Sequence, residues 1–285
     1  MKSYYGSNLT QRRLFSSFLR FATLTLLFAA IACIPAVADP VVQITQCNAV
    51  ISQPGHYILA NDLNCASSGD PSQPPFGIKI LASHVDLALD GHTISGDSSS
   101  GSFGIGVGEP FTNVGTNTDH VHIIGPGIVS HWSVGVYLSV DESSSVSEVT
   151  ADSNAVGLLD NGESDVLDGN TATNNNGSVD VGPFVAVGGI TIAKARKASV
   201  RNSTVSGNAA GITLIIAAIN DVRFNTVTNN SGVGIGLDNV SLHNSIFYNT
   251  VTGNGTLDLE DDTPNCDSNT WKNNTFGTAN QPCIH

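Results

Sequence analysis

The feature that most constrains the fold is a repeat of about 22 residues between Ser199 and Asn254. Its units begin with the short alternating runs Ser199-Val-Arg, Asp221-Val-Arg and Ser245-Ile-Phe. Each unit continues through a polar turn ending in Asn, then a glycine and a second apolar run. A repeat of this length without a helical stripe is typical of a solenoid of stacked parallel strands. One coil cannot bury its apolar face alone, so we expect the coils to fold together.

The Asn that ends each turn has a predicted structural role. Asn208, Asn230 and Asn254 occupy equivalent positions in consecutive units. A side-chain amide both donates and accepts, so stacked amides can bond from coil to coil. We therefore predict an asparagine ladder along one corner of the solenoid.

The length and composition favour one solenoid domain at residues 39–285. The 285 residues are enough for about nine coils of roughly 22 residues, and no break in composition suggests a second domain. Only 12% of residues are charged, whereas 40% are hydrophobic, which is enough for a continuous core. We assign residues 39–75 to an N-terminal cap and residues 256–285 to a C-terminal cap. The insertion Asn176–Gly188 lengthens one repeat, and we expect it to protrude as a loop.

Residues 1–38 match a signal peptide. The basic residues Lys2, Arg12, Arg13 and Arg20 precede the apolar run Phe21–Cys33, and Ala36-Val37-Ala38 is a small-residue cleavage site. We predict cleavage near Ala38 and export to the periplasm or the medium. The apolar run is too short for a membrane span of about 20 residues. Because Arg12-Arg13 also resembles a twin-arginine signal, both export routes stay open.

The charge of the mature chain limits its partners. Without the signal peptide, seven Lys and Arg face 24 Asp and Glu, a net charge near −17. Such a surface repels nucleic acid and anionic membranes, so we expect neither as a partner. It also repels a polyanionic substrate unless Ca²⁺ lies between them, which makes Ca²⁺ the candidate cofactor. We expect a monomer.

Four cysteines of the mature chain form two sequence-local pairs. Cys47 and Cys65 lie near the start, and Cys266 and Cys283 lie near the end. In an exported protein we predict the disulfides Cys47–Cys65 and Cys266–Cys283. The crossed pairings are excluded because nine stacked coils hold the two ends about 40 Å apart.

A family resemblance rests on the coil Gly77–Gly96 and on the Asn-Thr-Val-Thr repeats. The coil reads Gly77-Ile-Lys-Ile, then His84-Val-Asp-Leu-Ala-Leu-Asp-Gly-His-Thr-Ile-Ser-Gly96. Together with the repeats it resembles the pectate-lyase-like right-handed parallel β-helix superfamily, within the bacterial β-helix repeat and NosD-like group. The resemblance covers about residues 41–283. It implies a single-stranded, right-handed parallel β-helix, an all-β fold on which lyases, hydrolases, epimerases and non-enzymes occur.

Two clusters of chemically active residues emerge when the coils are aligned. We take as equivalent inward residues Val85, Val121, Val146, Val166, Val200, Val222 and Ile246. The first cluster is His84, Asp86, His120 and His122, with His92 one turn further along. Imidazoles and a carboxylate within reach of one another can bind a divalent metal or perform acid–base catalysis. The alternative is that these His and Asp side chains are simply exposed to solvent on the outer face of a sheet and have no functional role.

The second cluster lies in a basic stretch, where five of the seven Lys and Arg of the mature chain occur within 30 residues: Lys194, Arg196, Lys197, Arg201 and Arg223. Arg201 and Arg223 are stacked in the alignment, with Asp165, Asp168 and Asp221 nearby. The resemblance implies a comparison with the polysaccharide lyases of this superfamily, in which Asp residues bind Ca²⁺ and an Arg removes the proton at C5 of a uronate. The candidate catalytic set is therefore Arg201, Arg223, Asp165 and Asp221. The alternative is a set of surface ion pairs.

The chain departs from the enzymes that it resembles. It lacks the Gly-His-Gly and Arg-Ile-Lys motifs of polygalacturonases and the Asp-Pro-His-Asp motif of epimerases. We predict an exported protein that binds a polysaccharide or cell-surface glycan, and that is a lyase for a uronate polymer if it is an enzyme. The alternatives are a non-catalytic structural or surface-binding β-helix, and a NosD-like metal-handling periplasmic protein.

Overall fold

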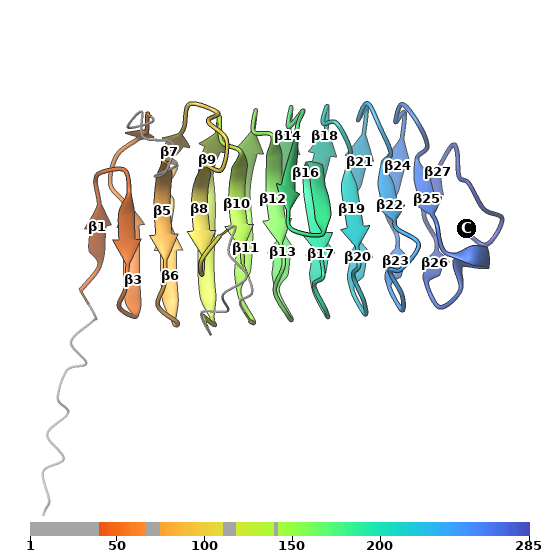
Figure 1. Ribbon diagram of the computed structural model, residues 1–285, viewed down its shortest axis with the longest axis horizontal. Coiled ribbons are helices and arrows are strands. Elements are labelled where there is room, and N and C mark those ends of the chain that lie inside the picture. The colour runs from red at the N-terminus through yellow and green to blue at the C-terminus, as the bar shows by residue number, and fades with distance from the viewer. Residues whose placement is uncertain (1–39, 67–74, 111–117, 140–141) are drawn as a thin grey trace, which may run out of the picture. The chain divides into compact units, whose positions relative to one another are not determined.

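The computed structural model describes residues 40–66, 75–110, 118–139 and 142–285. The predicted signal peptide lies outside the described residues. The chain divides after Ala38, and the unit Asp39–His285 is a stack of short parallel strands (Figure 1). Helix in the described ranges is limited to the 3-10 turn η1 (Pro264–Cys266), and no helix there could span a membrane.

The strands form two long sheets. The 17-stranded sheet, here the first sheet, has two columns of strands joined at a corner. Its first column contains β3 (Gly55–Leu59), β6 (Val85–Ala88), the start of β9 (Val121–Ser130), the start of β11 (Ser145–Asp152), β13 (Val166–Asp168), β17 (Ser199–Arg201), β20 (Asp221–Arg223), β23 (Ser245–Phe247) and β26 (Thr270–Lys272), with β1 (Val42–Ile44) paired to β3. Its second column contains β4 (Leu63–Asn64), β7 (Thr93–Ser95), the ends of β9 and β11, β14 (Thr171–Thr173), β18 (Thr204–Ser206), β21 (Thr226–Thr228), β24 (Thr250–Thr252) and β27 (Thr275–Phe276).

The second sheet lies opposite in each coil and precedes the first column along the chain. It contains β2 (Ala49–Ile51), β5 (Phe76–Ile80), β8 (Phe103–Val107), β10 (Val134–Leu138), β12 (Val156–Asp160), β16 (Phe184–Ala193), β19 (Ile212–Ile215), β22 (Ile235–Leu237) and β25 (Leu259–Asp261). Because β2 to β4 and β25 to β27 continue these sheets, the segments assigned as caps contribute strands of their own. The pairing among these strands is parallel, which makes the unit a parallel β-helix.

The sequence alternation explains which side chains form the core. In β20, Val222 is completely buried, whereas Asp221 and Arg223 on either side of it are half-buried. In β21, Val227 is completely buried between Thr226 and Thr228. Successive strand residues point to opposite faces, so each strand gives its middle residue to the interior. The coils stack these residues into one continuous apolar core.

Three ladders of polar side chains, buried except for the half-buried Asn254 and Asn274, hold the corners of the coils. The ladder after the second column contains Asn154, Asn175, Asn208, Asn230 and Asn254; the ladder between the columns contains Asn170, Ser203, Asn225, Asn249 and Asn274; the ladder before the first column contains Ser144, Asp165, Asn220, Asn244 and Asn269. The amide of Asn208 is typical, because its Nδ2 donates to Asn230 Oδ1 at 2.9 Å and to the carbonyl of Ala172 at 3.0 Å. The predicted ladder is therefore present, and two others accompany it.

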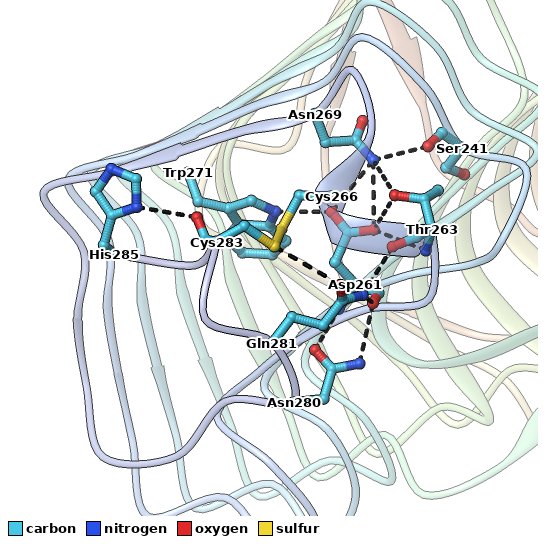
Figure 2. Close-up of a disulfide and its surroundings, with 10 residues drawn as sticks. All are labelled: Ser241, Asp261, Thr263, Cys266, Asn269, Trp271, Asn280, Gln281, Cys283 and His285. Atoms are coloured by element: carbon cyan, nitrogen blue, oxygen red, sulfur yellow. Dashed lines mark hydrogen bonds between the residues drawn. A yellow bond between two sulfur atoms is a disulfide. The ribbon is translucent and has the colours of Figure 1, made fainter.

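The C-terminal coil ends on a buried carboxylate and a disulfide. Asp261 accepts hydrogen bonds from Trp271 Nε1 at 2.8 Å and from Thr263 Oγ1 at 2.6 Å (Figure 2). The adjacent Cys266–Cys283 bond closes 17 residues, and the Cys47–Cys65 bond closes 18 residues near the other end of the solenoid. Both predicted disulfides are present. These bonds lie where the stacked coils lack a neighbour on one side.

The insertion Asn176–Gly188 forms a hairpin, so its prediction as a protruding loop is wrong. The strand β15 (Ser178–Val181) pairs antiparallel with the start of β16. Phe184 and Ala186 of this hairpin pack in one apolar cluster with Tyr137 and Leu159, which lie on the outer side of the second sheet. Burial of these apolar side chains stabilises the folded-back arrangement. Part of the second sheet is therefore covered, whereas the first sheet keeps an exposed outer face.

Candidate functional site

Four imidazoles and a carboxylate surround a surface hollow of about 450 Å³ on the N-terminal coils of the first column. The sequence predicted His84, Asp86, His120 and His122 as one cluster, and the structure brings all four together with His56. Asp86 lies in register with His56 on one side and with His122 on the other. His84 and His120 stand at the turns before β6 and β9, where φ is 56° and 53°.

Several nitrogen atoms of this hollow already have polar partners. His56 Nδ1 lies 2.9 Å from Asp86 Oδ2, and His122 Nδ1 lies 2.8 Å from Ser145 Oγ. The rings of His84 and His120 contact each other with centroids 5.1 Å apart. These contacts link the side chains of four consecutive coils into one polar patch.

Asp119 borders the patch through His120. Hydrogen bonds lower the pKa of Asp119 from its ordinary value. The larger effect comes from Ser83, and a smaller one comes from His120, whose Nδ1 lies 3.4 Å from the carboxylate. His92, the expected extension of the cluster, pairs instead with Asp62 at 3.1 Å.

The donor chemistry of the hollow suits a divalent transition metal, because imidazole and carboxylate bind copper(II), zinc and nickel. However, no group of three or more His, Cys, Asp or Glu side chains in the described ranges is placed to hold an ion. Asp86, the carboxylate of the set, is engaged by His56. The hollow therefore offers suitable donors that are not assembled into a metal centre.

A row of cationic and aromatic side chains follows the outer face of the first column towards the C-terminus. Arg201 lies directly beside Arg223, and the next residues in the same row are Phe247 and Lys272. Arg201 pairs with Asp168 at 3.0 Å, and Arg223 Nε pairs with Asp221 at 3.2 Å. The predicted stacking of the two arginines beside Asp168 and Asp221 is thus present. Both ion pairs are partly exposed, which limits their contribution to stability.

Asp165 does not lie on this outer face, and its placement beside the arginines is wrong. Its side chain is completely buried, and Asp165 Oδ1 accepts a hydrogen bond from the backbone N–H of Ser144 at 2.6 Å. It also hydrogen-bonds Asp160, a second completely buried carboxyl whose pKa is raised by burial. Asp165 therefore occupies a rung of the corner ladder, where a side-chain oxygen must accept from the neighbouring coil.

The alignment of the coils was wrong at three junctions, on either side of Val146 and between Val166 and Val200, and this explains the misplacement. The core position equivalent to Val146 is Ile123 rather than Val121, and in the next coil it is Leu167 rather than Val166. Asp86 and His122 consequently lie in the same outer row as Asp221. In order along the stack, this row contains His56, Asp86, His122, Ser145, Val166, Ser199 and Asp221.

An exposed pair of stacked aromatic rings escaped the sequence reasoning. Phe224 and Tyr248 are 52% and 53% exposed, with ring centroids 5.4 Å apart and planes inclined by 12°. Both stand at the corner between the two columns in the left-handed region, at φ 57° and 56°. The available signal was an aromatic residue directly before Asn-Thr-Val-Thr in two consecutive repeats.

Comparisons with known proteins agree with this fold. A family model described as "Periplasmic copper-binding protein (NosD)" matches residues 77–281. No curated protein sequence matches the chain. Among solved structures, the Dettilon tailspike protein has a TM-score of 0.55 at 19% identity, over 84% of this chain and 48% of that protein. The periplasmic alginate epimerase AlgG has a TM-score of 0.51 at 13% identity, over 79% of this chain and 70% of that protein.

At these identities the likeness establishes a shared fold. The chain spans about half the length of the tailspike protein. The predicted single right-handed parallel β-helix and the predicted resemblance to the NosD-like group are confirmed.

Proposed function

We propose that this chain, which belongs to the NosD family of β-helix proteins, binds an anionic polysaccharide along the outer face of the first column. The observation that carries this proposal is the stacked pair Phe224 and Tyr248, exposed beside the row of Arg201, Arg223 and Lys272. We name this surface, from β17 to β26, the cation–aromatic face.

The rings of Phe224 and Tyr248 are in an unusual position for aromatic side chains. Large apolar groups are normally buried, and a bulky residue in the left-handed region costs free energy. Strained residues that persist on a surface tend to cluster at ligand sites. The two rings are stacked with nearly parallel planes, and together they form an exposed apolar surface that can pack against the C–H face of a sugar ring.

The cations give this face its preference for anionic sugars. A guanidinium presents a planar set of donors that matches a carboxylate. The mature chain carries a net charge near −17, which repels a polyanion from most of the surface. Arg201, Arg223 and Lys272 bring positive charge to this face, so an anionic chain can approach it, and Ca²⁺ in solution would weaken the repulsion elsewhere.

The relatives support a polysaccharide as the ligand class. One of the structural neighbours is an alginate epimerase, whose substrate is an anionic polysaccharide. The chain lacks the Asp-Pro-His-Asp motif of such epimerases, as noted above. Arg201 and Arg223 are both held in ion pairs, and Asp165 is buried. We therefore propose binding without cleavage.

The test measures binding of alginate and pectate by calorimetry, with Ca²⁺ and with a chelator. We expect the double variant Phe224→Ala/Tyr248→Ala to bind at least about tenfold more weakly than the wild type. Val240→Ala removes an equally exposed apolar side chain away from this face and should bind normally. Absence of binding by the wild type to every anionic glycan would refute the proposal. A rise in the ultraviolet absorbance of unsaturated uronate ends would show that the protein is a lyase instead.

A second function, binding of copper(II), is favoured by the hollow around His84 and His120. The observation is the convergence of four imidazoles and Asp86 on one surface hollow. His84, Asp86, His120 and His122 would hold the ion, after rotation of exposed side chains. Titration with Cu²⁺ should show a site that is lost in His84→Ala/His120→Ala and kept in His131→Ala. Equal binding by all three proteins would exclude this hollow as the site.

A further inference from the structure

The second column carries two rows of hydroxyl side chains on its outer face from β14 to β27. One row contains Thr171, Thr204, Thr226, Thr250 and Thr275, and the other contains Thr173, Ser206, Thr228 and Thr252. The members of each row are in register in consecutive coils, and their strands are stacked in line (Figure 1). We name this surface the threonine face.

Strand propensity alone does not explain the threonine face. Threonine is favoured in strands because its branched side chain fits a pleated surface. However, the same coils place a mixture of residues at the equivalent outward positions of the first column, including Asp221, Arg223, Phe247 and Lys272. The threonine face therefore has a uniformity that its neighbouring column, made by the same coils, does not share.

Three hydroxyl groups in the middle of this face are open to solvent. Thr204, Thr226 and Thr250 are exposed, and their hydroxyl groups form no hydrogen bond with any other described residue. Neither row contains a charged residue between β14 and β27. The array ends where Asp152 of β11 takes the next position and accepts a hydrogen bond from Thr173 at 2.8 Å.

The face is held rigid from beneath and at both edges. Val205, Val227 and Val251 lie completely buried under it. The ladder of Asn225 and Asn249 fixes one edge, and the ladder of Asn208, Asn230 and Asn254 fixes the other. A β-branched side chain in a strand has a restricted χ1, so each threonine holds its hydroxyl and methyl groups in place. Such an array loses little entropy on binding a regular surface.

We propose that the threonine face binds the surface of an ice crystal. Its hydroxyl groups repeat about every 4.8 Å from strand to strand and about 6.7 Å along each strand. Hexagonal ice repeats its water positions at distances close to both. Each hydroxyl can occupy a lattice water position, while the adjacent methyl group fills the space between water molecules. A face without charges does not impose the strong ionic hydration that would disturb such a layer.

Ice fits this face better than a glycan chain does. The threonine rows hold no aromatic ring to stack on a sugar and no cation to pair with a carboxylate. The aromatic pair stands at the corner that borders the rows, and the cations lie beyond it on the first column. The two faces are therefore suited to different ligands, and this inference does not depend on the proposed glycan function.

The test measures thermal hysteresis and ice-crystal shape with the purified, disulfide-bonded protein. We expect the wild type to shape ice crystals and to separate the freezing point from the melting point. Thr226→Leu, at the centre of the rows, should reduce the hysteresis several-fold because the longer side chain displaces the ordered water. Thr270→Leu makes the same change at an outward position of the first column and should keep the activity. Thermal unfolding must show that both variants fold.

The outcomes separate the possibilities. Loss of ice activity in Thr226→Leu with retention in Thr270→Leu supports the proposal. Absence of ice shaping by the wild type overturns it, as does equal loss in the two variants. Binding to powdered crystalline cellulose or chitin through Thr226, without binding to ice, would identify the face as a carbohydrate surface and also overturn it.

Discussion

The two columns of the first sheet are built by the same coils and share the same inner side, but they differ on the outer side. Val222 and Val227, one from each column in a single coil, are both completely buried. Outside, the first column presents ion pairs and stands beside the aromatic corner, whereas the second column presents hydroxyl groups. The packing of the core fixes inward residues in every coil. The outward residues are free of this constraint and can adapt to different ligands.

The ladders that border the two columns also differ. The ladder after the second column consists of asparagines from Asn154 to Asn254. The ladder before the first column includes Asp165 at one rung, where it meets the buried Asp160. A neutral amide satisfies donors and acceptors alike, whereas a buried carboxyl keeps its proton or pays for desolvation. The ladder after the second column ends instead on Asp258, where hydrogen bonds from Asn254, Gly277 and Thr278 outweigh burial and lower the pKa, so we expect the two ladders to respond to pH in opposite directions.

The largest effect on both columns should come from the ladders. Asn208→Ala removes the acceptor for the backbone N–H of Asn175 and the donor to the carbonyl of Ala172. Two buried backbone groups lose their partners, so we expect about 3 kcal/mol or more off the free energy of unfolding. Asn225→Ala, between the columns, should cost a similar amount for the same reason.

Urea denaturation measures both ladder variants, and the exposed Asn176→Ala is the control. A loss below about 1 kcal/mol in either ladder variant would contradict the idea that the ladders support the two columns equally.

Removal of the C-terminal disulfide should be next in size. The Cys266→Ser/Cys283→Ser variant opens a loop of 17 residues, for which we expect a loss of about 3 kcal/mol. Because β26 and β27 form the last rung of both columns, hydrogen exchange should increase there in both columns and stay slow in β17 and β18. Faster exchange in one column alone would show that the columns do not end as one unit.

The pH response should separate the two ladders. Burial raises the pKa of Asp160, so the folded chain keeps a proton that the unfolded chain releases above about pH 4. This contribution to stability is therefore present at low pH and decreases as the pH rises. Asp160→Asn removes it, so the stability of the variant relative to the wild type should increase from pH 4 to pH 7.

The measurement is the urea midpoint as a function of pH, with the exposed Asp180→Asn as the control. A wild type whose stability shows the same pH dependence as Asp160→Asn would disprove the role of the buried pair.

The smallest effect on stability should come from the ion pairs of the first column. Arg201→Gln breaks a partly exposed pair with Asp168, so we expect a change below about 1 kcal/mol in the free energy of unfolding. Alginate binding should nevertheless weaken, because Arg201 belongs to the cation–aromatic face. Thr204→Ser, in the same coil but on the threonine face, should leave alginate binding unchanged. Normal alginate binding by Arg201→Gln would remove this arginine from the site.

The sequence predicted much of the fold because its signals are local. The repeat from Ser199 to Asn254 fixes which residues point inwards, and it places Asn208, Asn230 and Asn254 at one corner. The cysteine pairs are close in sequence, so their connectivity followed from the solenoid. The cluster of His84, Asp86, His120 and His122 was also found, because two adjacent coils carry it in similar runs.

The exact neighbours of each outer residue could not be predicted, because inward and outward residues alternate along every strand. A shift of two residues leaves the inward and outward faces unchanged. The strands β6 and β9 each bury two apolar residues that are two positions apart, Val85 with Leu87 and Val121 with Ile123. Either the first or the second residue of each strand could therefore be aligned with the buried residue of the later coils. Adjacent apolar residues at Val166 and Leu167 allowed a further shift, which placed Asp165 outside rather than in the ladder.

The sequence by itself determined the solenoid, its inward residues, its two disulfides and one ladder, because each depends on periodicity or on short separations along the chain. Only the tertiary structure decided the register between coils, and with it the burial of Asp165 and the stacking of Phe224 on Tyr248. It also decided that residues 176–188 fold back on the second sheet, since that contact depends on apolar side chains from other coils. Contacts between coils depend on the length of every intervening turn, which no local pattern records.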